Sequence, residues 1–225
     1  MLVMPDWSTH VKWARELGIS EEIADFINKL IDAPDEVLRN DPSELGELYR
    51  REPHNVRLII TGHDWGKRSK ARLSILRQYC YNRFGEKGVL AAELHHVLDY
   101  IAYIRNPENL ARMIINALTQ YGTRGLPMVE RIMLMRSYYG SREYQLNVKK
   151  LTMELSKLND QAYKEIITEL LKVKAEEWSL HREVLEFIQA NLDAILVDVD
   201  KWIKKHIRTK PVDHENRKLD EWFKT

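Results

Sequence analysis

Residues that interrupt helices are scarce in this chain, and this scarcity limits the possible fold more than any other feature of the sequence. The 225 residues include only nine glycines and seven prolines. Between them, apolar residues recur at intervals of three and four, which is the period of a helix that buries one face. We therefore expect an all-α protein, a helical bundle followed by a long helical hairpin. A chain of this length can bury a substantial core without a disulfide or a structural metal.

Capping residues and breakers predict short helices over the first 140 residues. Asp6 precedes a helix that Gly18 closes, and Ser20 can cap a second helix that runs to about residue 31. Residues 34–53 are acidic and contain three prolines, so we expect a loop-rich segment with one short helix at about 43–51. Further helices are expected at about 55–61, 69–84 and 89–105, the last two separated by Gly85 and Gly88, and two shorter ones follow before residue 140.

The pattern changes at Ser141, where long charged segments with heptad-like apolar spacing begin. This spacing predicts two helices, at about 142–175 and 178–207, packed as a hairpin on the preceding residues. We expect the hairpin to supply core and contact surface but no catalytic group. The predicted domains are a helical domain at 1–140, the hairpin at 141–208 and a polar tail at 209–225.

The charge of the chain argues against broad binding to nucleic acids or anionic membranes. Its 35 basic and 34 acidic residues nearly cancel, so no strong positive field surrounds the protein. Some basic and aromatic residues still lie close together in the sequence, where they could neutralise phosphates and stack bases. We favour the alternative, a solvated face on which arginine stems cover tyrosines. The set comprises Arg68, Lys70, Arg72, Arg77, Tyr79, Tyr81, Arg83, Arg124, Arg131, Arg136, Tyr138, Tyr139 and Arg142.

Targeting signals and reactive thiols are not expected. No apolar run approaches the roughly 20 residues that cross a bilayer, and the N-terminus lacks the pattern of a signal peptide, so we expect a cytoplasmic protein with no membrane partner. Cys80 is the single cysteine and lies in an apolar, aromatic context. We interpret it as a buried thiol and not as a nucleophile.

Histidines and aspartates form two groups with the spacing of metal ligands. His63 and Asp64 are adjacent at the expected end of a helix, where the chain can turn both side chains toward one cation. His95 lies four residues before Asp99 and His96 lies three before it, so either pair shares a helical face. Structural alternatives stay open, namely a capping pair at the helix end and one buried and one exposed histidine in the second group.

The segment His63-Asp64-Trp65-Gly66-Lys67 resembles the His-Asp-x-Gly-Lys signature of the HD-domain superfamily of metal-dependent phosphohydrolases. His10 is similar to the first metal-ligand histidine of that family, and the resemblance covers roughly residues 6–105. It implies an HD-like helical bundle that holds a divalent ion through His10, His63, Asp64 and a later aspartate. Such an ion polarises a phosphate ester and lowers the pKa of the attacking water.

The remaining site residues are also assigned from this resemblance. It implies that Asp64 takes part in catalysis and that Lys67 and Arg68 bind or orient the phosphate as cations. No aspartate occurs at 100–159, so Asp99 is the candidate closing ligand. His95 and His96 are similar to the additional histidines of members that hold two metals.

The expected function is a metal-dependent phosphohydrolase that acts on a nucleotide or another small phosphate ester. Its cofactor would be a divalent ion, with Mn, Mg, Ni, Co, Fe and Zn all open. The alternative is a non-catalytic helical protein that binds a partner protein or a nucleic acid. A homodimer is open in either case.

Overall fold

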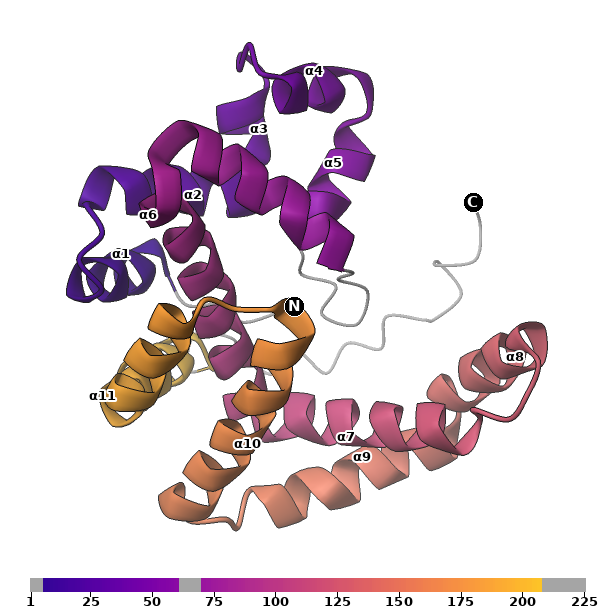
Figure 1. The fold of residues 1–225 in the computed structure, drawn as a ribbon. Coiled ribbons are helices and arrows are strands. Elements are labelled where there is room, and N and C mark those ends of the chain that lie inside the picture. Colours follow the sequence, from indigo (N-terminus) through magenta and orange to yellow (C-terminus); the bar gives the residue numbers. More distant parts are fainter. Residues whose placement is uncertain (1–5, 61–69, 208–225) are drawn as a thin grey trace.

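A computed structural model of the chain describes residues 6–60 and 70–207. All regular elements within these residues are helices, which confirms the all-α fold class (Figure 1). In chain order they are α1 (Trp7–Glu16), α2 (Glu21–Asp32), α3 (Pro34–Leu38), α4 (Glu44–Arg51), α5 (Pro53–Ile60), α6 (Lys70–Arg105), α7 (Pro107–Gly122), α8 (Met128–Tyr139), α9 (Arg142–Leu155), α10 (Asp160–Trp178) and α11 (Arg182–Ile207). The polar tail predicted at 209–225 lies outside the described residues.

The first helices begin where the caps predict. The side chain of Asp6 accepts a hydrogen bond from the backbone N–H of Thr9 at 3.0 Å, and Ser20 caps α2 in the same manner. Such bonds satisfy backbone donors that have no partner inside the helix. The segment at 34–53 is more regular than expected, because α3 precedes the predicted short helix α4.

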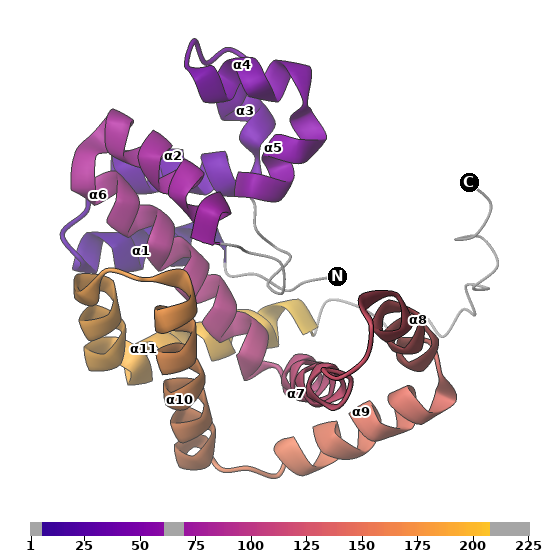
Figure 2. The same cartoon turned by 45° about the vertical axis from the view of Figure 1, so that its right-hand side comes forward.

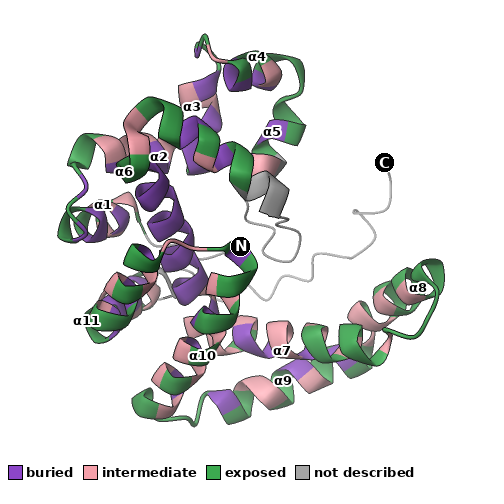
Figure 3. Cartoon of the chain, in the orientation of Figure 1, coloured by how far each residue is buried: buried purple, intermediate pink, exposed green. Residues whose placement is uncertain are grey.

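Helix α6 is the central element and consists of two helices joined at a sharp kink. Gly85 has φ 62° and ψ −153°, a conformation that side-chain-bearing residues rarely adopt. Gly88 also needs to be glycine, since a Cβ there would lie 2.6 Å from the carbonyl oxygen of Cys80. The two glycines therefore separate the helices as predicted. The part after the kink is buried along most of its length and packs against α1, α2, α10 and α11 (Figure 3).

The predicted C-terminal hairpin is wrong in its first helix. The chain breaks at residues 156–159, where Asn159 accepts a hydrogen bond from the backbone N–H of Ala162 at 2.8 Å and caps a new helix. The result is two helices in place of one, and α9 packs along α7 instead of α11 (Figure 2). Leu146 and Leu158, two apolar residues of this segment, are exposed.

Helices α10 and α11 do pack on α6, and an ion-pair network around the buried Glu93 joins them to it. Glu93, which is 4% exposed, accepts hydrogen bonds from Arg77 Nε at 2.7 Å and from the backbone N–H of His181 at 2.8 Å. Its carboxylate also contacts Nδ1 of His181 at 2.8 Å. Arg77 further donates to the carbonyl oxygen of Trp178 at the end of α10. His181 therefore has a structural role.

Helices α7, α8 and α9 form an arm that extends away from α6 (Figures 1 and 2). Helix α8 has no buried residue, and several of its apolar side chains face outward, among them Met128, Val129 and Met133. The arm therefore carries apolar surface that no described part of the chain covers.

Across 6–60 and 70–207, none of the helices combines the length and the hydropathy that a membrane span requires.

Candidate metal centre

The centre of the molecule contains a close pair of ionisable side chains from distant parts of the sequence. His10 projects from α1 and Asp99 from α6, and Nε2 of the histidine lies 3.1 Å from Oδ1 of the aspartate. The two residues are 3% and 1% exposed. A buried carboxylate is costly unless a cation or hydrogen-bond donors compensate it. The fold therefore requires positive charge or a proton at this position.

His95 completes a group of three. Its Nε2 atom lies 3.3 Å from Oδ2 of Asp99, one helical turn away on α6, and its ring stacks on that of His10. Ligand atoms of His10, His95 and Asp99 all lie within 4.8 Å of one another. Two imidazoles and a carboxylate are the ligand types of many catalytic zinc and iron sites, which leave further positions for water or substrate.

The backbone fixes which nitrogen of His10 faces the carboxylate. Nδ1 of His10 lies 3.2 Å from the carbonyl oxygen of Asp6, and a carbonyl oxygen only accepts hydrogen bonds. Nδ1 must therefore carry a proton, and Nε2 is the atom directed at Asp99. Metal-binding histidines are commonly oriented in this way, by a hydrogen bond from the nitrogen that does not bind the metal.

The same arrangement holds for His95, where the acceptor is a side chain of α2. Nδ1 of His95 lies 2.9 Å from Oδ1 of Asn28, while Nδ2 of Asn28 donates to the carbonyl oxygen of Trp7 at 3.5 Å. The amide nitrogen is thus directed at Trp7 and the amide oxygen accepts from the histidine. Both imidazoles consequently direct Nε2 toward Asp99.

Electrostatics in this group favour a positive charge beside Asp99. Burial opposes protonation of His95, but the carboxylates of Asp99 and Asp32 outweigh it and raise the pKa of His95 to about 9. Burial also favours the neutral acid form of Asp99, yet His95 and His10 hold the pKa of that carboxyl well below its usual range. Within the described residues, neither Nε2 of His95 nor Oδ2 of Asp99 makes a hydrogen bond of acceptable geometry. The two atoms lie 3.3 Å apart, so either a proton on Nε2 or a cation held by both atoms would compensate the buried carboxylate.

Comparisons with known proteins assign neither a family nor a function to the chain. No family model, curated protein or solved structure matches the chain.

The structure brings together part of the predicted ligand set. His10, His95 and Asp99 converge, while His96 is buried beside them with its ring perpendicular to that of His95 at a centroid distance of 5.7 Å. Among the described residues, His96 is not part of the converging group. The other predicted site residues, His63, Asp64, Lys67 and Arg68, lie outside the described residues, so their predicted roles stay predictions.

Two polar residues of the centre were missed by sequence reasoning. Asn28 and Asp32 lie one turn apart on α2. Asn28 Oδ1 lies 2.9 Å from Nδ1 of His95, and Asp32 Oδ1 lies 3.6 Å from Nε2 of the same ring. A signal was present, because Asn28 falls between Ile27 and Leu30, on the apolar face of an amphipathic helix. A polar residue on such a face usually has a buried partner.

Several members of the basic and aromatic set are engaged within the protein. Arg77 pairs with Glu93, the hydroxyl of Tyr79 donates to Asp41, and Arg83 lies 3.6 Å from the same aspartate. These contacts favour the structural interpretation of the set between residues 77 and 83.

The thiol of Cys80 is fully buried, and burial raises its pKa to about 12, as expected for a thiol without a catalytic role.

Proposed function

We propose that the protein is a metal-dependent phosphohydrolase whose ion is held by His10, His95 and Asp99. The observation that carries the proposal is the orientation of the two imidazoles. Each protonated Nδ1 is held by a separate acceptor, so both Nε2 atoms are directed at one buried carboxylate. An ordinary structural ion pair needs only one histidine and one carboxylate.

The phosphohydrolase class rests on the resemblance of residues 63–67 to the HD-domain signature together with this group. In the family that this signature resembles, the upstream histidine and the closing aspartate bind the same ion. The residues proposed for these two roles in this chain, His10 and Asp99, lie 3.1 Å apart. A bound divalent ion would supply a polarised phosphate and an activated water. The chain's own contribution is to hold Nε2 of each histidine and the carboxylate in place before the ion binds.

Metal content and hydrolysis test the proposal directly. We expect the purified chain to retain about one equivalent of a first-row transition ion after dialysis and to hydrolyse phosphate esters, including nucleotides, only when loaded. Chelation should abolish the hydrolysis, and re-addition of the ion should restore it. Absence of metal after growth in supplemented medium, together with no uptake by the chelated protein, would contradict the proposal.

A second candidate function, binding of a partner protein, is favoured by the arm. A groove of about 670 Å³ between α7 and α9 is lined by apolar side chains that include Ile115, Leu118 and Leu151. Leu118 is 66% exposed and Met133 on α8 is 67% exposed. Exposed apolar surface of this kind commonly receives an amphipathic helix.

Sedimentation equilibrium tests the simplest partner, a second copy of the chain. If the arm mediates a homodimer, the double variant Leu118→Glu, Met133→Glu should be monomeric at concentrations where the unmodified chain is dimeric. Replacement of Leu158 by glutamate, at an exposed position outside the arm helices, serves as the control. A monomer at every concentration would contradict self-association through this surface.

A further inference from the structure

Asp32 lies at the edge of the metal centre and is not required by the three converging ligands. It is the last residue of α2, and its Oδ1 atom lies 3.6 Å from Nε2 of His95. Its side chain is 23% exposed, whereas the side chains of His95 and Asp99 are both 1% exposed. Among the described residues, two carboxylates lie beside His95, and Asp32 is more exposed to solvent than Asp99.

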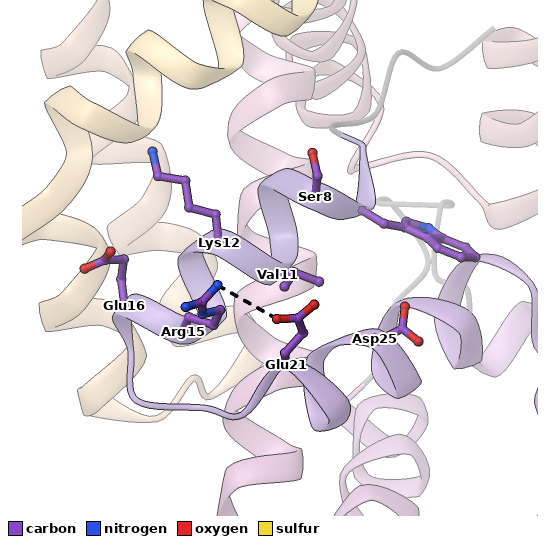
Figure 4. Close-up of a pocket in the computed structure, with 8 residues that line it drawn as sticks. Ser8, Val11, Lys12, Arg15, Glu16, Glu21 and Asp25 are labelled. Atoms are coloured by element: carbon purple, nitrogen blue, oxygen red, sulfur yellow. Dashed lines mark ion pairs between the residues drawn. The ribbon is translucent and has the colours of Figure 1, made fainter.

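The position of Asp32 is set by Trp7. The indole Nε1 of Trp7 donates a 2.8 Å hydrogen bond to Oδ2 of Asp32, which leaves Oδ1 directed at His95. Trp7 also lines a surface groove of about 680 Å³ between α1 and α2, which Arg15 and Glu21 cross as an ion pair (Figure 4). Trp7 thus contacts the groove on one side and the edge of the metal centre on the other.

Distances argue that Asp32 is not a direct ligand. Two ligands on opposite sides of an ion with bonds of about 2.1 Å are about 4.2 Å apart, so all ligands of one ion fit within a small sphere. Ligand atoms of His10, His95 and Asp99 all lie within 4.8 Å of one another, close to this limit, and Asp32 is not a member of that group. Its place is in the next shell, beside a ligand.

We propose that Asp32 is an outer-shell carboxylate of the metal centre, positioned by Trp7, that supplies the second negative charge needed to hold a divalent ion. With both imidazoles neutral, Asp99 provides a single negative charge among the described ligands, and Asp32 raises the total to two. A divalent ion is then neutralised without a further buried charge. The inference rests on the proposed function only in requiring that the centre bind metal.

Titration with Co²⁺ alone tests this role, because the visible spectrum of the ion reports its ligands independently of any activity. We expect Asp32→Asn, which keeps an acceptor for Trp7, to weaken Co²⁺ binding by about 10- to 100-fold. The shape of the spectrum should not change, since the direct ligands remain. Asp32→Glu, which restores the charge, should recover part of the affinity.

Asp25→Asn is the matched control. Asp25 also lies on α2, is 44% exposed and pairs with Lys29, so its loss removes the same charge away from the centre. Affinity within about twofold of the unmodified chain is expected there. Equal affinities for Asp32→Asn and Asp25→Asn would overturn the proposal, as would an altered spectrum, which would make Asp32 a direct ligand. Failure of the unmodified chain to bind Co²⁺ would instead refute the metal centre itself.

Discussion

The imidazole rings of His10 and His95 stack face to face, with centroids 4.1 Å apart and planes inclined by 16°. Two positive charges at about 4 Å repel by roughly 4 kcal/mol at an effective dielectric constant of about 20. Protonation of both rings is therefore unfavourable even with Asp99 beside them. One proton on a single ring, or one divalent ion held by the group, would supply the positive charge that Asp99 requires without this repulsion.

Replacement of Asp99 by alanine should remove metal binding. Asp99 is the single carboxylate in the converging group, so we expect Co²⁺ affinity to fall by at least about 100-fold. Helix content should be retained, because alanine is the better helix former. Isothermal titration and circular dichroism measure the two effects. Asp193→Ala, at an exposed residue paired with Lys164, should bind as the unmodified chain does; unchanged binding in Asp99→Ala would exclude Asp99 as the closing ligand.

The metal-free protein should lose stability as the pH rises from 6.5 to 9. The pKa of His95 is about 9 in the folded chain against 6.5 for an unperturbed histidine, so its protonation stabilises the fold fully below pH 6.5. This contribution disappears as the pH passes through about 9. Thermal unfolding in a chelator at several pH values measures it. The dependence should be absent from His95→Gln, and a melting temperature that rises over this window would contradict the assignment.

The thiol of Cys80 should be unreactive in the native protein. Burial raises its pKa to about 12, so almost no thiolate exists at pH 8, and the side chain is inaccessible. Reaction with a chromogenic disulfide reagent should therefore appear only after denaturant is added. Rapid labelling of the folded chain would show that the region around α6 opens.

The network around Glu93 should contribute strongly to stability. Glu93→Gln leaves Arg77 without its buried counter-ion, and we expect the free energy of unfolding to fall by about 3 kcal/mol. Urea denaturation provides the measurement. The control is Glu183→Gln on α11, where an exposed pair with Lys87 at 3.7 Å should be worth less than about 0.5 kcal/mol. Equal effects in the two variants would show that the network adds nothing beyond a surface pair.

Local signals in the sequence predicted much of the helical structure, whereas tertiary packing decided the rest. The caps at Asp6 and Ser20 and the kink at Gly85 follow from conformational preferences of single residues, and these predictions were confirmed. The break before Asn159 was missed because apolar spacing continues across it, and only the cap marks it. Packing partners, such as α9 on α7, depend on surfaces far apart in the chain and leave no local pattern.

The candidate site shows the same division. The spacing of His95 and Asp99 indicated a shared helical face, and the structure places both beside His10. Asn28 and Asp32 were missed because their partner, His95, lies on another helix. Their role becomes visible only when α2 is packed against α6.

The ion-pair contact between His10 and Asp99 joins residues that are 89 positions apart. An ion bound there would act as a reversible cross-link, closing a loop that contains most of the first half of the described chain. Cross-links of long loops restrict the unfolded ensemble most, by several kcal/mol in the chain-entropy model. Metal supply would then determine how firmly α1 stays attached to the rest of the protein, and limited proteolysis near the N-terminus would report the metal content of the molecule.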